Sequence, residues 1–282
     1  MQETLFIRFH EIILIVYLIS ILCYFIDFVR KSHKIRVLGI YALGIVWFLQ
    51  TISLSMYITS HSDVLFNSIF DVFFFLSWMI ISISLVLNII KVLSFSVFFL
   101  NVIGFILLTL NTFRPEHYTN SIQRVQVINE LLLVHVGLAV LSYAFFALAF
   151  VNALLYIIQY KNLKEKNFNQ KYFRIGSVAT LEKIIFFSTL GGLLILILSV
   201  ILIAQWGIYA VGVAIFKDPK VMLSVIITLL YTGYIVMYLK KKIISINLIY
   251  FNIMIFCLCM VNLFFITHFN YKKTYVGGLV YA

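Results

Sequence analysis

Eight long apolar runs, separated by charged or polar residues, constrain the fold of this 282-residue chain more than any other feature. A helix that crosses a membrane needs about 20 apolar residues, because the hydrocarbon layer is about 30 Å thick. Hydrophobic residues make up 63% of the chain and charged residues only 11%, which is not the balance of a soluble domain. We therefore expect an all-α polytopic membrane protein, a single integral membrane domain over residues 1–282 with a bundle of eight transmembrane helices, near 12–29, 37–57, 69–90, 92–110, 129–160, 184–206, 221–238 and 243–268.

The placement of the basic residues predicts the orientation of these helices. If the N-terminus is outside, two thirds of the 21 lysines and arginines fall on the inner connections. Cytoplasmic loops of membrane proteins carry such an excess. The sequence thus predicts a multi-pass protein of the cell (cytoplasmic) membrane, in contact with the lipid bilayer and with both termini outside. The net charge of +11 then reflects topology, and no nucleic acid is expected as a partner.

Histidines collect on the predicted outer face, which carries five of the six. His61 and His117 lie in short polar connections, where a surface role is the simpler interpretation. His135 and His268 each lie 26 residues from the inner basic edge of their helix, a rise of about 39 Å. Both should therefore reach the outer interface at a similar height. From spacing alone, a site formed by this pair and a purely structural role remain equally open.

The connection between the sixth and seventh helices, residues 204–220, lies on the same face and contains Trp206, Tyr209, Asp218, Pro219 and Lys220. Counted from the inner edge of its helix, Trp206 should lie at about the height of the two histidines. Haem needs an apolar slot, and neutral imidazole suits its iron. The pattern therefore suggests haem as a cofactor, with His135 and His268 as axial ligands of the iron.

Two further polar residues near the outer face are candidates for the haem pocket. His10 falls at the outer edge of the first helix, and Asp71 falls near the start of the third. A carboxylate near the end of a membrane span is costly unless it faces a cavity or a partner. Hydration of Asp71 from outside is an equally good interpretation.

The longest inner connection carries a cluster of basic residues that is a candidate docking surface for a cytoplasmic protein. It comprises Lys161, Lys164, Lys166, Lys171 and Arg174. Anchoring of the helices by the positive-inside effect explains these charges equally well.

No motif points to catalysis. The sequence lacks a phosphate-binding glycine loop, a zinc-ligand spacing and a nucleophile with a paired base. Cys257 and Cys259 point to different sides of one helix, since residues two apart are about 200° around the axis. We interpret these two and Cys23 as packing residues and expect a protein that is not an enzyme.

Three segments resemble the cytochrome c assembly proteins of the CcsA/ResC type. HVGLAVLSYAFFALAFVNALLYII, from His135, resembles the family's helix that begins with an outer haem-ligating histidine, and MVNLFFITH, ending at His268, resembles its last helix. The segment LEKIIFFSTLGGLLILILSVILIAQWGIY, followed by DPK at 218–220 and LLY at 229–231, is similar to the haem-handling region. The resemblance implies haem binding by the two histidines.

The haem-handling region departs from the synthases of this family. Only Trp206 remains of a tryptophan cluster, Val221 stands in place of a glutamate, and Val236 stands in place of an inner histidine. This pattern, together with VWFLQT in the first half, is closer to the HemX-type branch.

The branch implies a membrane regulator that lowers the level of glutamyl-tRNA reductase, the committed enzyme of tetrapyrrole synthesis. Its partners would be haem outside and, directly or indirectly, the reductase inside. Haem delivery or cytochrome c maturation remains the alternative function, and a structural scaffold is a third possibility.

Overall fold

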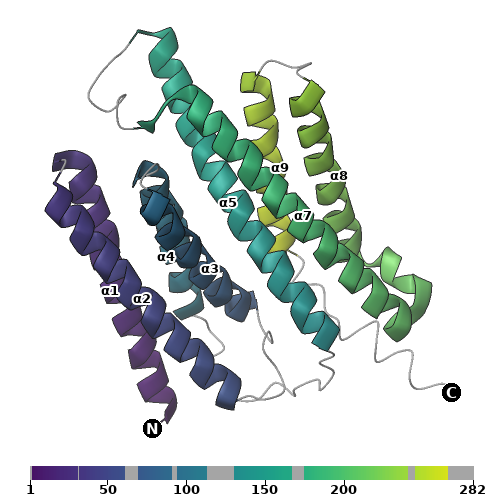
Figure 1. The fold of residues 1–282 in the computed structure, drawn as a ribbon. Coiled ribbons are helices and arrows are strands. Elements are labelled where there is room, and N and C mark those ends of the chain that lie inside the picture. The colour runs from purple at the N-terminus through teal and green to yellow at the C-terminus, as the bar shows by residue number, and fades with distance from the viewer. Residues whose placement is uncertain are drawn as a thin grey trace.

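A computed structural model describes residues 2–30, 32–60, 69–90, 94–112, 130–166, 175–240 and 245–265. Its long helices, labelled as in Figure 1, are α1 (Gln2–Arg30), α2 (His33–Ser60), α3 (Ile69–Ile90), α4 (Ser94–Thr112), α5 (Glu130–Lys164), α7 (Val178–Val211), α8 (Pro219–Lys240) and α9 (Ser245–Phe265). A short 3-10 helix, η2 (Gly212–Lys217), joins α7 to α8. Eight helices in the described residues are long and apolar enough to cross a membrane, and these residues contain no strand. The all-α membrane fold with eight spanning helices is therefore confirmed.

Several helices extend beyond the apolar runs that predicted them. The helix expected over 12–29 begins at Gln2, and the helix expected over 129–160 continues to Lys164. The helix expected over 184–206 begins at Val178, because Ser177 caps it by accepting a hydrogen bond from the Thr180 amide at 3.2 Å. Apolar runs locate the part of a helix inside the hydrocarbon, whereas capping residues determine where the helix ends.

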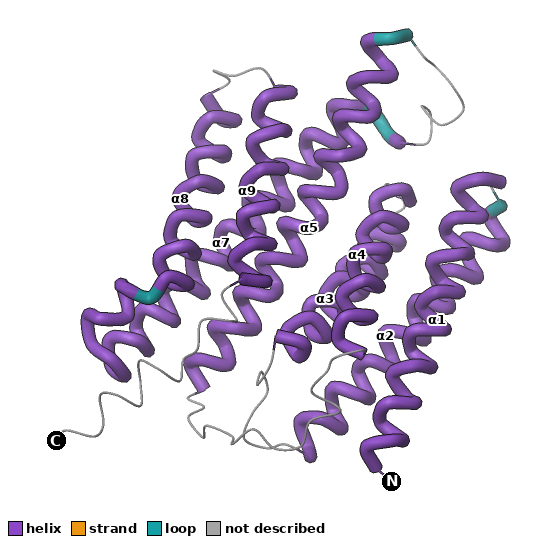
Figure 2. Tube along the Cα trace, turned by 180° about the vertical axis from the view of Figure 1, so that it is seen from behind, coloured by secondary structure: helices purple, strands orange, loops and turns teal. Residues whose placement is uncertain are grey.

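Consecutive helices run in opposite directions, so that α1 begins and α9 finishes at the same end of the bundle (Figure 1). This end also contains His135, near the start of α5, and we call it the His135 end. At the opposite end, the Lys161 end, α5 finishes and α7 begins. Figure 2 shows that α5 projects beyond the other helices at the Lys161 end. Which end faces the cytoplasm remains a prediction from the distribution of charge.

The helices form two groups with two apolar cores, and α3 and α4 contribute side chains to both cores. In the first group, α1 to α4 pack around buried side chains that include Tyr17, Leu43 and Phe74. In the second group, α7, α8 and α9 pack with α5 around residues such as Phe146 and Tyr231. The two groups meet where α5 contacts α3 and α4 (Figures 1 and 2).

Small residues and buried hydrogen bonds hold the helices together, as expected where no water competes. Gly192 on α7 lies against the Phe146 ring of α5, where an added Cβ would come within 2.6 Å of the ring. In the described part of the chain, buried polar side chains pair across helices in five places at distances of 2.7–3.1 Å: Tyr17 with Asn101, Tyr24 with Asn88, Ser96 with Asn152, Asn252 with Thr189, and Asn262 with Tyr143. Cys23, Cys257 and Cys259 are free thiols, as predicted, although Cys257 is exposed on α9 instead of packed inside.

Candidate functional site

His135 lies in the second turn of α5 and is held by a single residue of α7. Its Nδ1 is 2.7 Å from the backbone oxygen of Ser199 and 2.8 Å from the hydroxyl of the same residue. The Ser199 hydroxyl in turn donates to the backbone oxygen of His135 at 3.0 Å. His135 and Ser199 are therefore joined by three contacts between the two helices, two of them to the imidazole and one to the backbone of His135.

These contacts determine which ring nitrogen carries the proton. A carbonyl oxygen can only accept a hydrogen bond, so Nδ1 of His135 must be the donor to Ser199. In a neutral ring, Nε2 then keeps its lone pair and is able to bind a metal ion. Metal-binding histidines in proteins are oriented in the same way, by donation from the other ring nitrogen to a carbonyl or carboxylate.

The loop from α7 to α8 closes over a small apolar cluster at the same end. Ile203, Ile215 and Val221 are buried together, and Trp206 packs against them. Gly207 makes this closure possible, because an added Cβ at this position would overlap the side chain of Ile215. Val221 near the start of α8, the position of the glutamate in the synthases that this region resembles, is thus buried in this apolar cluster.

Asp218, Pro219 and Lys220 start α8. The Asp218 carboxylate accepts a hydrogen bond from the Lys220 amide at 2.8 Å, which makes Asp218 the N-cap. Pro219 is the first helical residue, a position where its missing N–H costs nothing. The Lys220 side chain is exposed at the start of α8. Asp218 and Pro219 therefore have a structural role in starting α8, in addition to any role in binding a ligand.

The structure brings some of the predicted pocket residues together and separates others along the helix axis. His135 lies beside Ser199, seven residues before Trp206 on α7, and this spacing corresponds to about 10 Å. The expectation that Trp206 lies at the height of His135 was therefore wrong by about two turns, because α5 and α7 are offset along their axes: Ser199 is 16 residues from Lys183, whereas His135 is 26 residues from Lys161. Tyr209 lies in the last turn of α7, and His268 lies outside the described residues.

His10 and Asp71 lie in the first helix group. The buried His10 has its Nε2 atom 3.4 Å from the Ser53 hydroxyl, and its ring lies 5.5 Å from the Phe74 ring between centroids. Asp71 is half-buried in the first turn of α3. These contacts place His10 in the core of α1 to α3.

Sequence reasoning missed Ser199. It is one of several serines in apolar helices, and its pairing with His135 spans 64 residues of sequence. A polar residue inside a long apolar run was the available signal. Its partner could not be assigned without the register of α7 against α5.

The predicted docking residues at the Lys161 end are described in part. Lys161 forms an ion pair of 3.9 Å with Glu165, one turn further along. Lys164 ends α5, and Lys166 has a φ of 54°, a left-handed conformation that terminates the helical turn. Lys171 and Arg174 lie outside the described residues.

The His135 end therefore offers an imidazole whose Nδ1 is occupied by Ser199, an apolar loop with one tryptophan, and an exposed lysine at the start of α8. This set of groups fits a ligand that combines a metal ion with an apolar body and carboxylates. Imidazole supplies the metal ligand, the loop supplies apolar surface, and lysine pairs with carboxylates. Haem has each of these parts, so the described residues fit it.

Comparison with known proteins assigns the chain to a family. The family described as "Cytochrome C assembly protein" matches residues 40–270. Protein HemX of Bacillus subtilis (strain 168) is 33% identical over 266 residues, which cover 94% of this chain and 96% of that protein. Protein HemX of Brevibacillus brevis is 28% identical over 253 residues, covering 90% of this chain and 93% of its own length. The chain is thus a HemX-type member of the cytochrome c assembly protein family.

Proposed function

We propose that this protein is a non-enzymatic regulator in the cytoplasmic membrane that lowers the level of glutamyl-tRNA reductase, and that it binds haem at its outer face. The observation that carries the haem part is the pairing of His135 with Ser199, which leaves Nε2 with its lone pair at the end of the bundle. The regulatory part rests on the similarity to the two HemX proteins over nearly the whole chain.

In this proposal, His135 and His268 bind the iron, and the first residues of α8 and the end of α7 form the pocket. Bound haem would supply an iron ion that imidazole nitrogens can ligate. Trp206 would contribute aromatic surface, Tyr209 in the last turn of α7 is a further candidate from the sequence, and Lys220 would attract the haem carboxylates. Asp218 and Pro219 hold Lys220 in place by starting α8 at this point.

The inner part of the proposal concerns the basic residues at the Lys161 end. Binding outside would favour one arrangement of α5, α7, α8 and α9, and the cluster formed by Lys161, Lys164, Lys166, Lys171 and Arg174 would then engage the reductase, directly or through another protein. A ligand shifts such an equilibrium only by its difference in affinity for the two arrangements. Identical conformations with and without haem would therefore contradict this mechanism.

The haem site is tested by visible absorption of the purified protein after haem is added. We compare the wild type with a variant carrying both His135→Ala and His268→Ala, and with His33→Ala as a control. His33 is exposed at the start of α2, at the Lys161 end. The expected result is a six-coordinate low-spin spectrum that the double variant loses and the control keeps. Equal haem binding by all three proteins would refute the site.

Regulation is tested separately in cells. Deletion should raise glutamyl-tRNA reductase and porphyrin while covalent c-type cytochromes remain. Complementation with a protein neutralised at its five docking residues should fail to lower the reductase. The family also contains cytochrome c assembly proteins, so haem delivery is the alternative. Loss of c-type cytochromes on deletion, with reductase unchanged, would favour it.

A further inference from the structure

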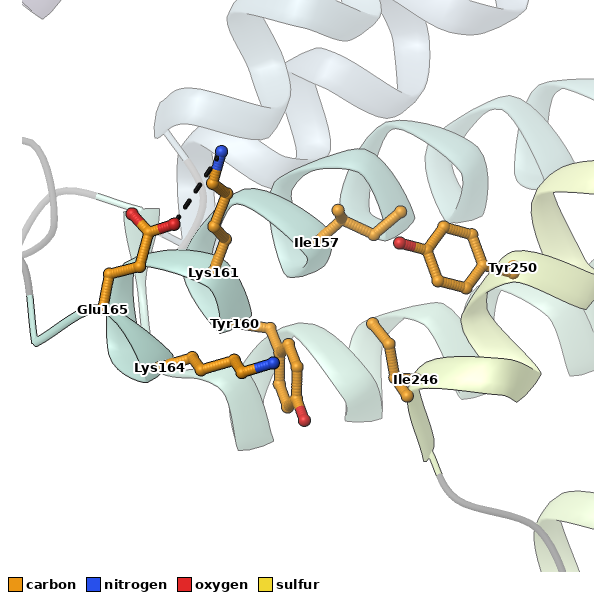
Figure 3. A pocket seen from close by; sticks show the side chains of 7 residues that line it. All are labelled: Ile157, Tyr160, Lys161, Lys164, Glu165, Ile246 and Tyr250. Atoms are coloured by element: carbon orange, nitrogen blue, oxygen red, sulfur yellow. Dashed lines mark ion pairs between the residues drawn. The ribbon is translucent and has the colours of Figure 1, made fainter.

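An open groove of about 470 Å³ lies between α5 and α9 at the Lys161 end, far from His135. Four of its lining residues come from the last turns of α5, one follows the end of α5, and two come from the start of α9 (Figure 3). They are Ile157, Tyr160, Lys161, Lys164, Glu165, Ile246 and Tyr250. The proposed function uses the lysines of this region only as a docking surface and leaves the groove unassigned.

The walls of the groove change from apolar to polar along α5. Ile157 faces the ring of Tyr250, whose hydroxyl points toward α5, and Ile246 lies next to the ring of Tyr160 (Figure 3). Tyr160 is in turn stacked on Tyr156, with centroids 6.2 Å apart and planes 7° from parallel. Tyrosines with an apolar ring and a polar hydroxyl are enriched where a membrane meets water.

The rim of the groove carries a net positive charge. Lys161 pairs with Glu165 at 3.9 Å, but the two side chains are 72% and 52% exposed. Exposed pairs of this kind contribute little and are readily rearranged. Lys164 extends along the ring of Tyr160 (Figure 3), and it has no ion pair within the described residues. Two cations and one anion at the rim therefore favour an anionic ligand.

The position of the groove indicates which kind of anion would bind there. One spanning segment ends at Lys164 and another begins at Ile246, so the groove lies at the boundary of the hydrocarbon layer. We propose that it binds an anionic phospholipid, with the phosphodiester between Lys161 and Lys164 and an acyl chain along Ile157 and Ile246. Basic pockets between membrane helices bind lipid headgroups in this way. A soluble phosphate would use the rim and gain nothing from the apolar walls.

The test is native mass spectrometry of the purified full chain, titrated with phosphatidylglycerol and, separately, with phosphatidylethanolamine. Phosphatidylglycerol is expected to bind more tightly, and Lys164→Gln is expected to weaken it about fivefold, since a lysine near a membrane surface contributes about this factor. Lys34→Gln is the matched control, because Lys34 is exposed at the same end of the bundle but outside the groove. It should leave the affinity unchanged.

Three results would overturn the proposal. One is equal binding of the two lipids by the wild type. Another is an equal loss of affinity in Lys34→Gln and Lys164→Gln, which would indicate a general charge effect. The third is complete displacement of phosphatidylglycerol by glycerol phosphate at the same concentration, which would indicate a site for a soluble phosphate. The measurement uses purified protein, so it holds whether or not the chain regulates the reductase.

Discussion

Replacing Ser199 by alanine would test whether α7 orients the His135 ring for ligand binding. The change removes the serine hydroxyl, with its contacts of 2.8 Å to Nδ1 and 3.0 Å to the backbone oxygen of His135. It leaves the 2.7 Å bond from Nδ1 to the Ser199 backbone oxygen intact. The ring therefore keeps its protonated nitrogen but loses one of its two anchors on α7.

The expected magnitudes follow from these contacts. A hydrogen bond between membrane helices contributes about 0.6 kcal/mol on average and at most about 1.7 kcal/mol. Neither His135 group is orphaned, because the carbonyl bond and the helix's own bonds remain. We therefore expect the free energy of unfolding to fall by about 0.5–1 kcal/mol. Removing a residue that orients a metal ligand weakens metal binding about 10- to 100-fold. With one anchor retained, we expect haem affinity to fall about three- to tenfold.

Two assays separate these effects. Haem titration followed at the Soret band measures affinity, and SDS-induced unfolding in mixed micelles, followed by far-ultraviolet circular dichroism, measures stability. His135→Ala should abolish the low-spin spectrum, whereas Ser199→Ala should keep it at reduced affinity. Wild-type affinity and stability in Ser199→Ala would refute the role assigned to the hydroxyl. Complete loss of haem in that variant, with the fold intact, would also contradict it.

Four further substitutions, of which Gly191→Ala is a control, probe packing and helix capping near the site and are followed by the same unfolding assay. Gly192→Ala should destabilise the fold by about 1–3 kcal/mol, because its Cβ would lie 2.6 Å from the buried Phe146 ring. The control Gly191→Ala should be neutral or slightly stabilising, because the nearest contact of its added Cβ is at 3.7 Å. Gly207→Ala should cost a similar 1–3 kcal/mol and shift the tryptophan fluorescence, since the loop beside it must open. Asp218→Ala should cost about 1 kcal/mol through loss of the N-cap of α8, and an unchanged stability would show that the cap contributes nothing.

Hydrophobicity alone predicted the fold because the bilayer permits few alternatives. All eight apolar runs became helices, since a backbone in hydrocarbon must satisfy its own hydrogen bonds. The ends of the helices were less predictable. Ser177 extends α7 by capping it outside the apolar run, and Lys164 ends α5 a full turn beyond Tyr160. Both positions depend on local hydrogen bonds that the membrane does not impose.

The candidate site was predictable in its chemistry and less so in its geometry. Residue type and resemblance pointed to His135, and the contact of its Nδ1 with a carbonyl oxygen implies a tautomer suited to metal binding. The register between α5 and α7 depends on side-chain packing, such as Gly192 against Phe146, which hydropathy does not record. For this reason Ser199 was missed and Trp206 was placed about two turns from its position. Hydropathy also could not reveal that Val221 fills an apolar cluster.

One helix, α5, carries both His135 and Lys161, and with 35 residues it is about 52 Å long. No hinge or loop separates its two ends, so a tilt of the whole helix would move both of them. A tilt of about 5° about its midpoint would move each end by about 2 Å, in opposite directions. α7 lies along α5 for much of its length, so it would tilt together with α5. The contacts of α5 with α3 and α4 would then be the point about which α5 tilts. Any ligand that distinguishes two tilts at one end therefore changes, by the same free energy, what binds at the other.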